Sequence, residues 1–267
     1  MDDSFREIVW QKGRELYRDM PWRHTESPYA ILVSEIMLQQ TQVERVIPKY
    51  QQFMEVFPTL ATLASASLAD VLAYWSGLGY NRRAKYLHEA AKCVVAEGGV
   101  FPTTLSELMR LPGVGKNTAG ALCAYAYNQP VAFIETNVRT VYFYHYFSQT
   151  LQVSDAELLE VVARTVDQEH PREWYWALMD YGVFLKKQGA GQLSKSAHYK
   201  KQAPLKGSVR EVRGAILRAL AQTDMDVVML RNVVAGDERF KKALAGLLRD
   251  GLIEQHETRL QLPHKSV

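Results

Sequence analysis

Hydrophobic residues recur at helical spacing along most of this chain, and strand-like alternation is scarce. Residues 2–19 predict an amphipathic helix, and Ser27 and Pro28 read as the N-cap and first residue of the next helix. Pro48 is expected near the start of a helix that runs through residue 57. Further helices are predicted within residues 63–75, 81–98, 104–111, 118–127, 138–147, 155–167 and 174–185. The first part of the chain is therefore expected to be all-α.

Polar residues mark two of these helix starts. Thr104 and Glu107 have the spacing of a capping box. Asn137 is predicted to cap the helix at 138–147, because asparagine side chains accept hydrogen bonds from first-turn amides.

The pattern changes after residue 185. Lysines are interleaved with small and polar residues over 186–206, which indicates either a basic loop laid on nucleic acid or a solvated linker. Three helices follow, at 208–222, 227–234 and 240–249, and residues 252–254 and 259–262 alternate like a two-stranded wing. We expect a helical domain over 1–190, a basic linker or loop over 191–207, and a small α/β, winged-helix-like module over 208–267. Such modules often bind DNA, and they also serve as plain packing.

Composition narrows the class of protein. The chain has 267 residues, and 47% of them are hydrophobic, which is enough for a core. Its formal net charge of +3 permits nucleic-acid binding without requiring it. Its two cysteines, Cys93 and Cys123, sit in apolar helical patterns and read as buried free thiols, so a thiolate zinc site or a four-cysteine iron–sulfur cluster is excluded. A signal peptide and a membrane-spanning run are both missing, so we expect a soluble cytoplasmic protein, nucleoid-associated if bacterial or archaeal, with no membrane partner.

The stretch Leu111-Pro-Gly-Val-Gly-Lys-Asn-Thr-Ala119 combines a glycine hairpin with a helix start. Gly113 and Gly115 allow close approach to the main chain, and the amides that follow point outward together at a helix N-terminus. This arrangement suits a nucleic-acid phosphate, with Lys116 adding a charge. An ordinary tight turn between two helices is the alternative.

Two carboxylates accompany the hairpin. Glu35 lies among apolar residues of the helix after Pro28, where a carboxyl has a raised pKa and can act as an acid near neutrality. The alternative is a surface glutamate on the polar face of that helix. Glu135 lies downstream of the hairpin, in Phe133-Ile-Glu-Thr-Asn-Val138.

Five segments, in this order, resemble the helix-hairpin-helix DNA glycosylases of the endonuclease III superfamily, most closely the adenine DNA glycosylase (MutY) branch. They are Pro21-Trp-Arg23, Ser34-Glu-Ile-Met-Leu-Gln-Gln-Thr-Gln-Val43, Trp75-Ser-Gly-Leu-Gly-Tyr80, Leu111-Pro-Gly-Val-Gly115 and Met179-Asp-Tyr-Gly182. The hairpin is shared by many DNA-binding proteins, whereas the run from Ser34 is far more specific. The resemblance implies two helical subdomains with the substrate base flipped into the cleft between them.

The resemblance also assigns roles to individual residues. It implies catalysis by Glu35 and Glu135, a base pocket with Trp22, Arg23 and Asn117, and DNA intercalation by Gln40 and Tyr80. It also implies that the hairpin at Gly113 and Gly115 binds a phosphate, with Lys116 and Thr118 beside it, and that carbonyls near Leu111 and Val114 hold a monovalent cation. The basic character of two segments, rather than the resemblance, suggests DNA contacts by Arg82, Arg83, Lys200 and Lys201. No other cofactor is expected. The partner is expected to be double-stranded DNA with a lesion or mismatch, bound by a monomer.

The expected reaction needs two carboxylates. One protonates the departing base, and the other stabilises the oxocarbenium character of the sugar that remains. Adenine opposite 8-oxoguanine or guanine is the first candidate substrate.

Three departures from the family pattern leave alternatives open. Glu135 stands where the family has an aspartate, the four-cysteine iron–sulfur loop is replaced by the lysine-rich stretch, and Asn117 stands where lyase members have a lysine. The pocket is adapted to glutamate, or another base such as uracil, thymine or hypoxanthine is excised, or the protein binds distorted DNA without cleaving it. The missing lysine predicts a monofunctional enzyme.

Overall fold

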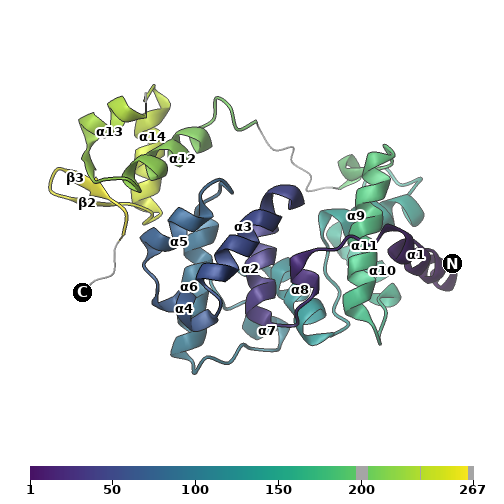
Figure 1. Ribbon diagram of the computed structural model, residues 1–267. Helices are drawn as coiled ribbons and strands as arrows, with labels where there is room; N and C mark the ends of the chain where they lie inside the picture. Colours follow the sequence, from purple (N-terminus) through teal and green to yellow (C-terminus); the bar gives the residue numbers. More distant parts are fainter. Residues whose placement is uncertain (197–203, 235, 264–267) are drawn as a thin grey trace. The chain divides into compact units, whose positions relative to one another are not determined.

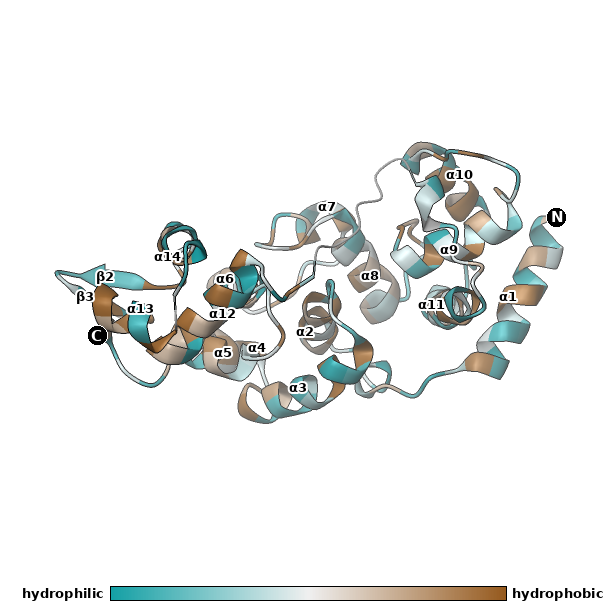
Figure 2. Cartoon of the chain, turned by 90° about the horizontal axis from the view of Figure 1, so that it is seen from above, coloured by the Kyte–Doolittle hydropathy of each residue, from teal (hydrophilic) through white to brown (hydrophobic). Residues whose placement is uncertain are grey.

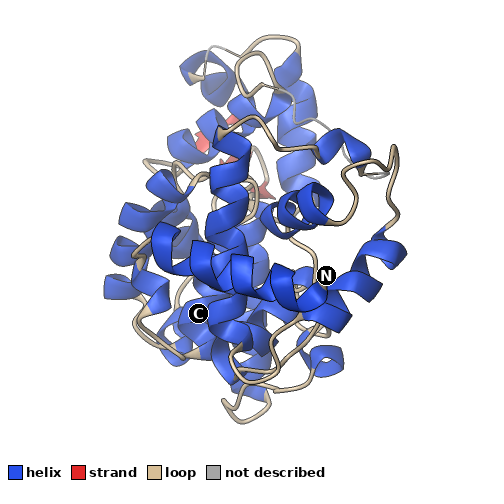
Figure 3. Cartoon of the chain, turned by 90° about the vertical axis from the view of Figure 1, so that its right-hand side faces the viewer, coloured by secondary structure: helices blue, strands red, loops and turns tan. Residues whose placement is uncertain are grey.

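The computed structural model describes residues 1–196, 204–234 and 236–263, and these are mostly helical (Figure 3). They divide into two compact units, each built from segments far apart in sequence. One unit contains residues 1–32, 102–110 and the described residues from 114 to 196. The other contains residues 33–101, 111–113 and the described residues from 204 onward. The domain boundaries expected at 190 and 207 stay predictions.

The first unit is organised around α11 (Pro171–Lys187), which packs against α1 (Asp2–Leu16) and α9 (Thr136–His145) (Figure 1). Its other elements are η1 (Pro21–Arg23), α7 (Leu105–Leu108), α8 (Lys116–Tyr127), α10 (Asp155–Thr165) and η2 (Leu193–Lys195). Large aromatic side chains fill the core, among them the fully buried Trp174, Tyr142 and Tyr175. Burial of these large rings contributes apolar area that stabilises the packing of the three helices.

Local chemistry explains where several of these helices begin and end. Pro171 opens α11 at a position where the missing amide has no cost. The left-handed Asn128 (φ 50°) ends α8, and Pro130 prevents its continuation. Ser154 and Glu157 form a capping box at the start of α10.

The second unit packs α6 (Arg82–Ala96) against α4 (Leu60–Ser65) and α5 (Leu68–Trp75), with α3 (Val43–Val56) beside α5. The helix α2 (Pro28–Leu38) has residues in both units. Figure 2 shows α2 as apolar along most of its length, and nearly all of its side chains are buried. A helix that is apolar all round belongs in an interior.

The C-terminal segment has the order α12 (Val209–Leu220), β1 (Met225–Asp226), α13 (Val227–Val233), α14 (Arg239–Arg249), β2 (Glu254–His256) and β3 (Arg259–Gln261). The antiparallel sheet has the order β1-β3-β2, so Leu260 pairs with Met225 on one side and Gln255 on the other. The expected α-helical fold with a small C-terminal α/β module is confirmed. The sequence pattern missed β1, because two residues give no detectable alternation.

Three local predictions were wrong. The helix α3 begins at Val43, so Pro48 lies inside it rather than near its start, because burial of Val46, Tyr50 and Phe53 on one face outweighs a lost hydrogen bond. Asn137 does not cap α9; the N-cap is Glu135. Cys123 is buried as expected, but Cys93 is only half-buried. In the described part of the chain, no helix is long and apolar enough to cross a membrane.

Candidate active site and DNA-contacting residues

Glu35 is the one carboxylate of α2, and it is half-buried between Ser34 and Ile36, which are buried. The structure thus places a half-buried carboxyl on a helix whose other side chains are mostly buried, and its role as an acid stays a prediction. Because α2 is buried along its length, this side chain has a fixed backbone beneath it.

Glu135 belongs to the other unit and stands at the N-cap of α9. The side chain is half-buried. Burial raises the pKa of the Glu135 carboxyl above its ordinary value, and the positive charge of Lys186 opposes that rise. Glu135 is thus a carboxyl whose charge depends on a specific cation.

Lys186, in the last turn of α11, interacts electrostatically with this carboxyl. Its ammonium donates a hydrogen bond to Asn137 Oδ1 at 2.6 Å, while burial lowers its pKa and Glu135 opposes that change. Glu135, Asn137 and Lys186 form what we call the Glu135 cluster. The sequence pattern predicts that this helix ends at 185 and that Lys186 belongs to the basic stretch. In the structure α11 continues to Lys187, so Lys186 lies one helical turn beyond Gly182.

Gly182 allows α11 and α9 to approach closely at this cluster. A Cβ at position 182 would lie 2.5 Å from the main-chain oxygen of Asn137, closer than any real contact. The Asn137 amide also reaches Met179 Sδ at 3.8 Å. The segment from Met179 to Gly182 therefore positions the start of α9.

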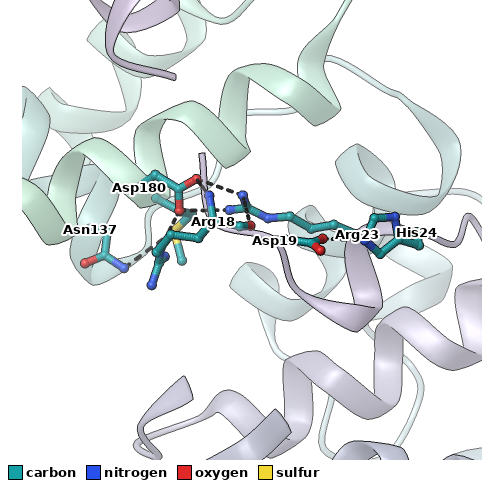
Figure 4. A network of polar contacts seen from close by, with 7 residues as sticks. Arg18, Asp19, Arg23, His24, Asn137 and Asp180 are labelled. Carbon is teal, nitrogen blue, oxygen red and sulfur yellow. Dashed lines mark hydrogen bonds and ion pairs between the residues drawn. The ribbon is translucent and has the colours of Figure 1, made fainter. Parts of the chain in front are cut away.

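Arg23 is buried and makes an ion pair with Asp180 of α11, on which Arg18 also converges (Figure 4). The Arg23 guanidinium donates to both Asp180 oxygens, at 2.7 and 3.0 Å, and Arg18 Nε donates to Oδ1 at 2.6 Å. The rings of Tyr17 and Trp176 lie 5.1 and 5.4 Å from the Arg23 guanidinium. The guanidinium is therefore enclosed by a carboxylate and two rings, and the assignment of Arg23 to the base pocket stays a prediction.

The other two residues assigned to the base pocket differ in their exposure to solvent. Trp22 is buried, whereas Asn117 is exposed in the first turn of α8. Both pocket assignments stay predictions.

The two residues expected to enter the DNA stack share an unusual backbone. Gln40 and Tyr80 have φ values of 54° and 48°, in the left-handed region that non-glycine residues rarely adopt. Gln40 is exposed and Tyr80 is half-buried. Arg210 of the C-terminal module donates to the Tyr80 hydroxyl, and its guanidinium lies 4.9 Å from the ring centre. The module thus contacts an expected DNA-inserting residue, which the sequence pattern did not indicate.

Arg82 and Arg83 follow shortly after Tyr80, and they differ in burial. Arg82 is largely exposed and remains a candidate DNA contact, whereas Arg83 is buried and its guanidinium is occupied by backbone oxygens. The expectation of a DNA contact by Arg83 is therefore contradicted by its burial. Lys200 and Lys201 lie outside the described residues.

The hairpin residues have the backbone that the sequence predicts. Gly113 has φ 75°, and a Cβ there would lie 2.6 Å from Tyr86 Cβ. Gly115 is the N-cap of α8 and faces open space, and Lys116 is exposed beside it. First-turn amides have no acceptor within a helix, so they are available to an anion. Thr118, in contrast, is buried, as are Leu111 and Val114.

A sequence profile of the HhH-GPD superfamily of base excision DNA repair proteins matches residues 33–164. The adenine DNA glycosylase of Mycolicibacterium smegmatis is 35% identical over 263 residues, which cover 89% of this chain and 88% of that protein. This chain belongs to the HhH-GPD superfamily. The expected class, a DNA glycosylase of base excision repair that acts on DNA, is confirmed at the level of the family.

Further comparisons agree with this assignment. The adenine DNA glycosylase of Buchnera aphidicola is 34% identical over 173 residues, which cover 63% of this chain. The same match covers 48% of that protein, so this chain spans about half of its length. The solved structure of a thermostable thymine-DNA glycosylase superposes with a TM-score of 0.63 and 28% identity, over 68% of this chain and 86% of that one. The glycosylase fold expected from the motifs is therefore confirmed.

The iron–sulfur cluster of related glycosylases does not fit this HhH-GPD chain. Such a cluster needs four thiolates, and the sequence contains two cysteines, which lie in separate helices. The segment that begins at Lys186 stands where the cluster loop is expected.

Proposed function

We propose that this protein is a monofunctional DNA glycosylase that excises adenine opposite 8-oxoguanine or guanine. The observation that carries the proposal is the Glu135 cluster, in which a half-buried lysine hydrogen-bonds Asn137 and interacts electrostatically with the Glu135 carboxylate. Support for adenine comes from the relatives, which are named adenine DNA glycosylases.

In this mechanism Glu35 donates a proton to the departing base while the N-glycosidic bond breaks. The Glu135 carboxylate then stabilises the positive charge that develops on the sugar. A water molecule adds at the anomeric carbon and gives a proton to the Glu35 carboxylate, which restores the acid. Glu135 must be ionised for this role. Lys186 favours the ionised form, because its charge opposes the rise in pKa that burial imposes.

Asn117 supports the monofunctional part of the proposal. A lyase step requires an amine that forms a covalent adduct with the sugar, and position 117 offers an amide instead. Lys116 lies next to it but projects about 100° away around a helix. The proposal also includes a lesion-bearing duplex bound by a monomer, with a monovalent cation at the hairpin carbonyls near Leu111 and Val114.

A second candidate is excision of another base, such as thymine, uracil or hypoxanthine. Glu135 in place of the family's aspartate favours it, because the longer side chain moves the carboxylate by about one bond length. The similarity to a thymine-DNA glycosylase also favours it.

A single-turnover cleavage screen tests both candidates. It compares duplexes with adenine opposite 8-oxoguanine or guanine against duplexes with uracil, thymine or hypoxanthine opposite guanine. We expect cleavage of the adenine duplexes, with Glu35→Gln and Glu135→Gln abolishing cleavage but retaining DNA binding. Cleavage of another base alone would favour the second candidate. Tight binding without any cleavage would overturn both and indicate a lesion-binding protein.

A further inference from the structure

Arg83 is a buried cation that reaches the end of α2. Its Nη1 donates to the main-chain oxygens of Ile36, Met37 and Gln39, at 2.7, 2.9 and 2.7 Å. The last carbonyls of a helix have no donor within that helix, so one guanidinium nitrogen serves as their cap. The loop that begins at Gln39 is thereby tied to α6.

The second nitrogen of the same guanidinium reaches the loop before α6. Nη2 donates to the main-chain oxygens of Leu78 and Gly79, at 3.2 and 3.0 Å, and to Thr41 Oγ1 at 3.1 Å. One planar group therefore joins two loops that are about forty residues apart in the sequence. The guanidinium is further enclosed by the rings of Trp75 and Tyr80, 5.4 and 5.6 Å away.

The residues held by Arg83 directly precede the two residues expected to enter DNA. Gln39 precedes Gln40, and Gly79 precedes Tyr80, and both following residues have a left-handed backbone. A left-handed non-glycine residue costs about 1–2 kcal/mol and persists only where its surroundings fix it. The guanidinium supplies this constraint to both loops at once.

Among the residues that the structure describes, the hydrogen-bond partners of Arg83 include no carboxylate. These six hydrogen bonds go to neutral oxygens, so they do not neutralise the buried guanidinium, and burial lowers the Arg83 pKa to about 10. The burial of this charge has a free-energy cost, and the hydrogen bonds that offset it fix the two loops.

We propose that Arg83 is a positioning residue that holds Gln40 and Tyr80 as one rigid wedge, so that both side chains enter the duplex in register. The inference rests on the proposed function, because it assumes that these two residues intercalate. It replaces the DNA contact expected for Arg83 by an action through its neighbours.

The wedge is tested by measuring base extrusion separately from cleavage. A duplex with 2-aminopurine beside the target base reports unstacking by its fluorescence, whether or not the bond is cut. We expect Gln40→Ala and Tyr80→Ala each to lower the extruded fraction about tenfold, and the double variant to lose little more than either single one. Fold changes that multiply in the double variant would show that the residues act independently and would overturn the proposal.

Arg83→Lys then tests the link itself. A lysine keeps the charge but cannot hold both loops with a planar fork, so the extruded fraction should fall about tenfold while duplex affinity changes less than threefold. Lys92→Met, which removes an exposed cation from the same helix, is the matched control and should leave both values unchanged. If Arg83→Lys fails to fold, the non-additive effect of Gln40→Ala and Tyr80→Ala, measured with Arg83 in place, still tests whether the two residues act as one unit. A wild type that extrudes the base but cleaves no duplex would contradict the proposed function while leaving this inference standing.

Discussion

Lys186 and Asn137 connect the end of α11 to the start of α9 through a hydrogen bond of 2.6 Å. Asn137 lies two residues after Glu135, so the same contact places a cation beside a carboxyl whose pKa burial raises. The charge of Glu135 therefore depends on a residue fifty-one positions away in the sequence.

The first prediction concerns Lys186→Met. The substitution removes the charge that opposes the raised pKa of Glu135, so that pKa rises further and more of the carboxyl is protonated at a given pH. Because the reaction requires ionised Glu135, the acidic limb of the single-turnover rate profile should move to higher pH. At any pH on that limb, below the apparent pKa, the rate should fall by about tenfold for each unit of the move.

Lys187→Met is the control for this prediction, since Lys187 is exposed on the next position of the same helix. Its profile should coincide with that of the wild type. A Lys186→Met profile that keeps its midpoint and loses only amplitude would show that the lysine does not set the charge of Glu135.

The second prediction concerns Glu135→Asp, which restores the residue type of the family. If Lys186 and Asn137 have adapted to the longer side chain, the shorter carboxylate is withdrawn by about 1 Å, and the cleavage rate should fall by about a hundredfold. Single-turnover rates at saturating enzyme measure this without interference from DNA affinity. A rate equal to or above that of the wild type would show that the cluster is not adapted to glutamate.

Much of this fold follows from local patterns. Helical periodicity predicted the positions of most helices, and the hairpin glycines were recognised because a positive φ at Gly113 and a helix start at Gly115 have sequence signatures. The apolar helix around Glu35 leaves a surface glutamate as an alternative, and the motif that runs from Ser34 is what assigns Glu35 the role of the acid.

The partners of buried charges could not be predicted in this way. The contacts of Arg23 with Asp180 and of Lys186 with Asn137 join segments that no periodicity relates. An arginine in a basic run such as Arg82-Arg83 reads as a DNA contact, and only packing shows which of the two is buried. The tertiary fold, rather than residue type, decides such roles.

The third prediction concerns the stability of the first unit. Asp180→Asn removes the carboxylate on which Arg18 and Arg23 converge and leaves a buried guanidinium without its counter-charge. Removing one partner of a buried ion pair costs about 3–5 kcal/mol of the free energy of unfolding. Urea unfolding followed by tryptophan fluorescence measures the loss. Asp19→Asn is the control, because Asp19 is exposed and its pairing with His24 should contribute less than about 1 kcal/mol.

The last prediction separates two roles of the hairpin glycines. Gly113→Ala forces a side chain into the left-handed region (φ 75°) and places a Cβ 2.6 Å from Tyr86, so the variant should lose about 1–3 kcal/mol of stability and also bind DNA less tightly. Gly115→Ala meets nothing within 4 Å and keeps an ordinary φ of −86°, so its stability should be unchanged.

DNA affinity distinguishes the two hypotheses for this stretch. A methyl group at position 115 lies where a phosphate would approach the first-turn amides of α8, and we expect it to weaken duplex binding about tenfold, or roughly 1.4 kcal/mol. Fluorescence anisotropy at several salt concentrations measures the loss, with thermal unfolding as the check on folding. An unchanged dissociation constant for Gly115→Ala would favour the ordinary tight turn, because that turn tolerates the methyl group without consequence.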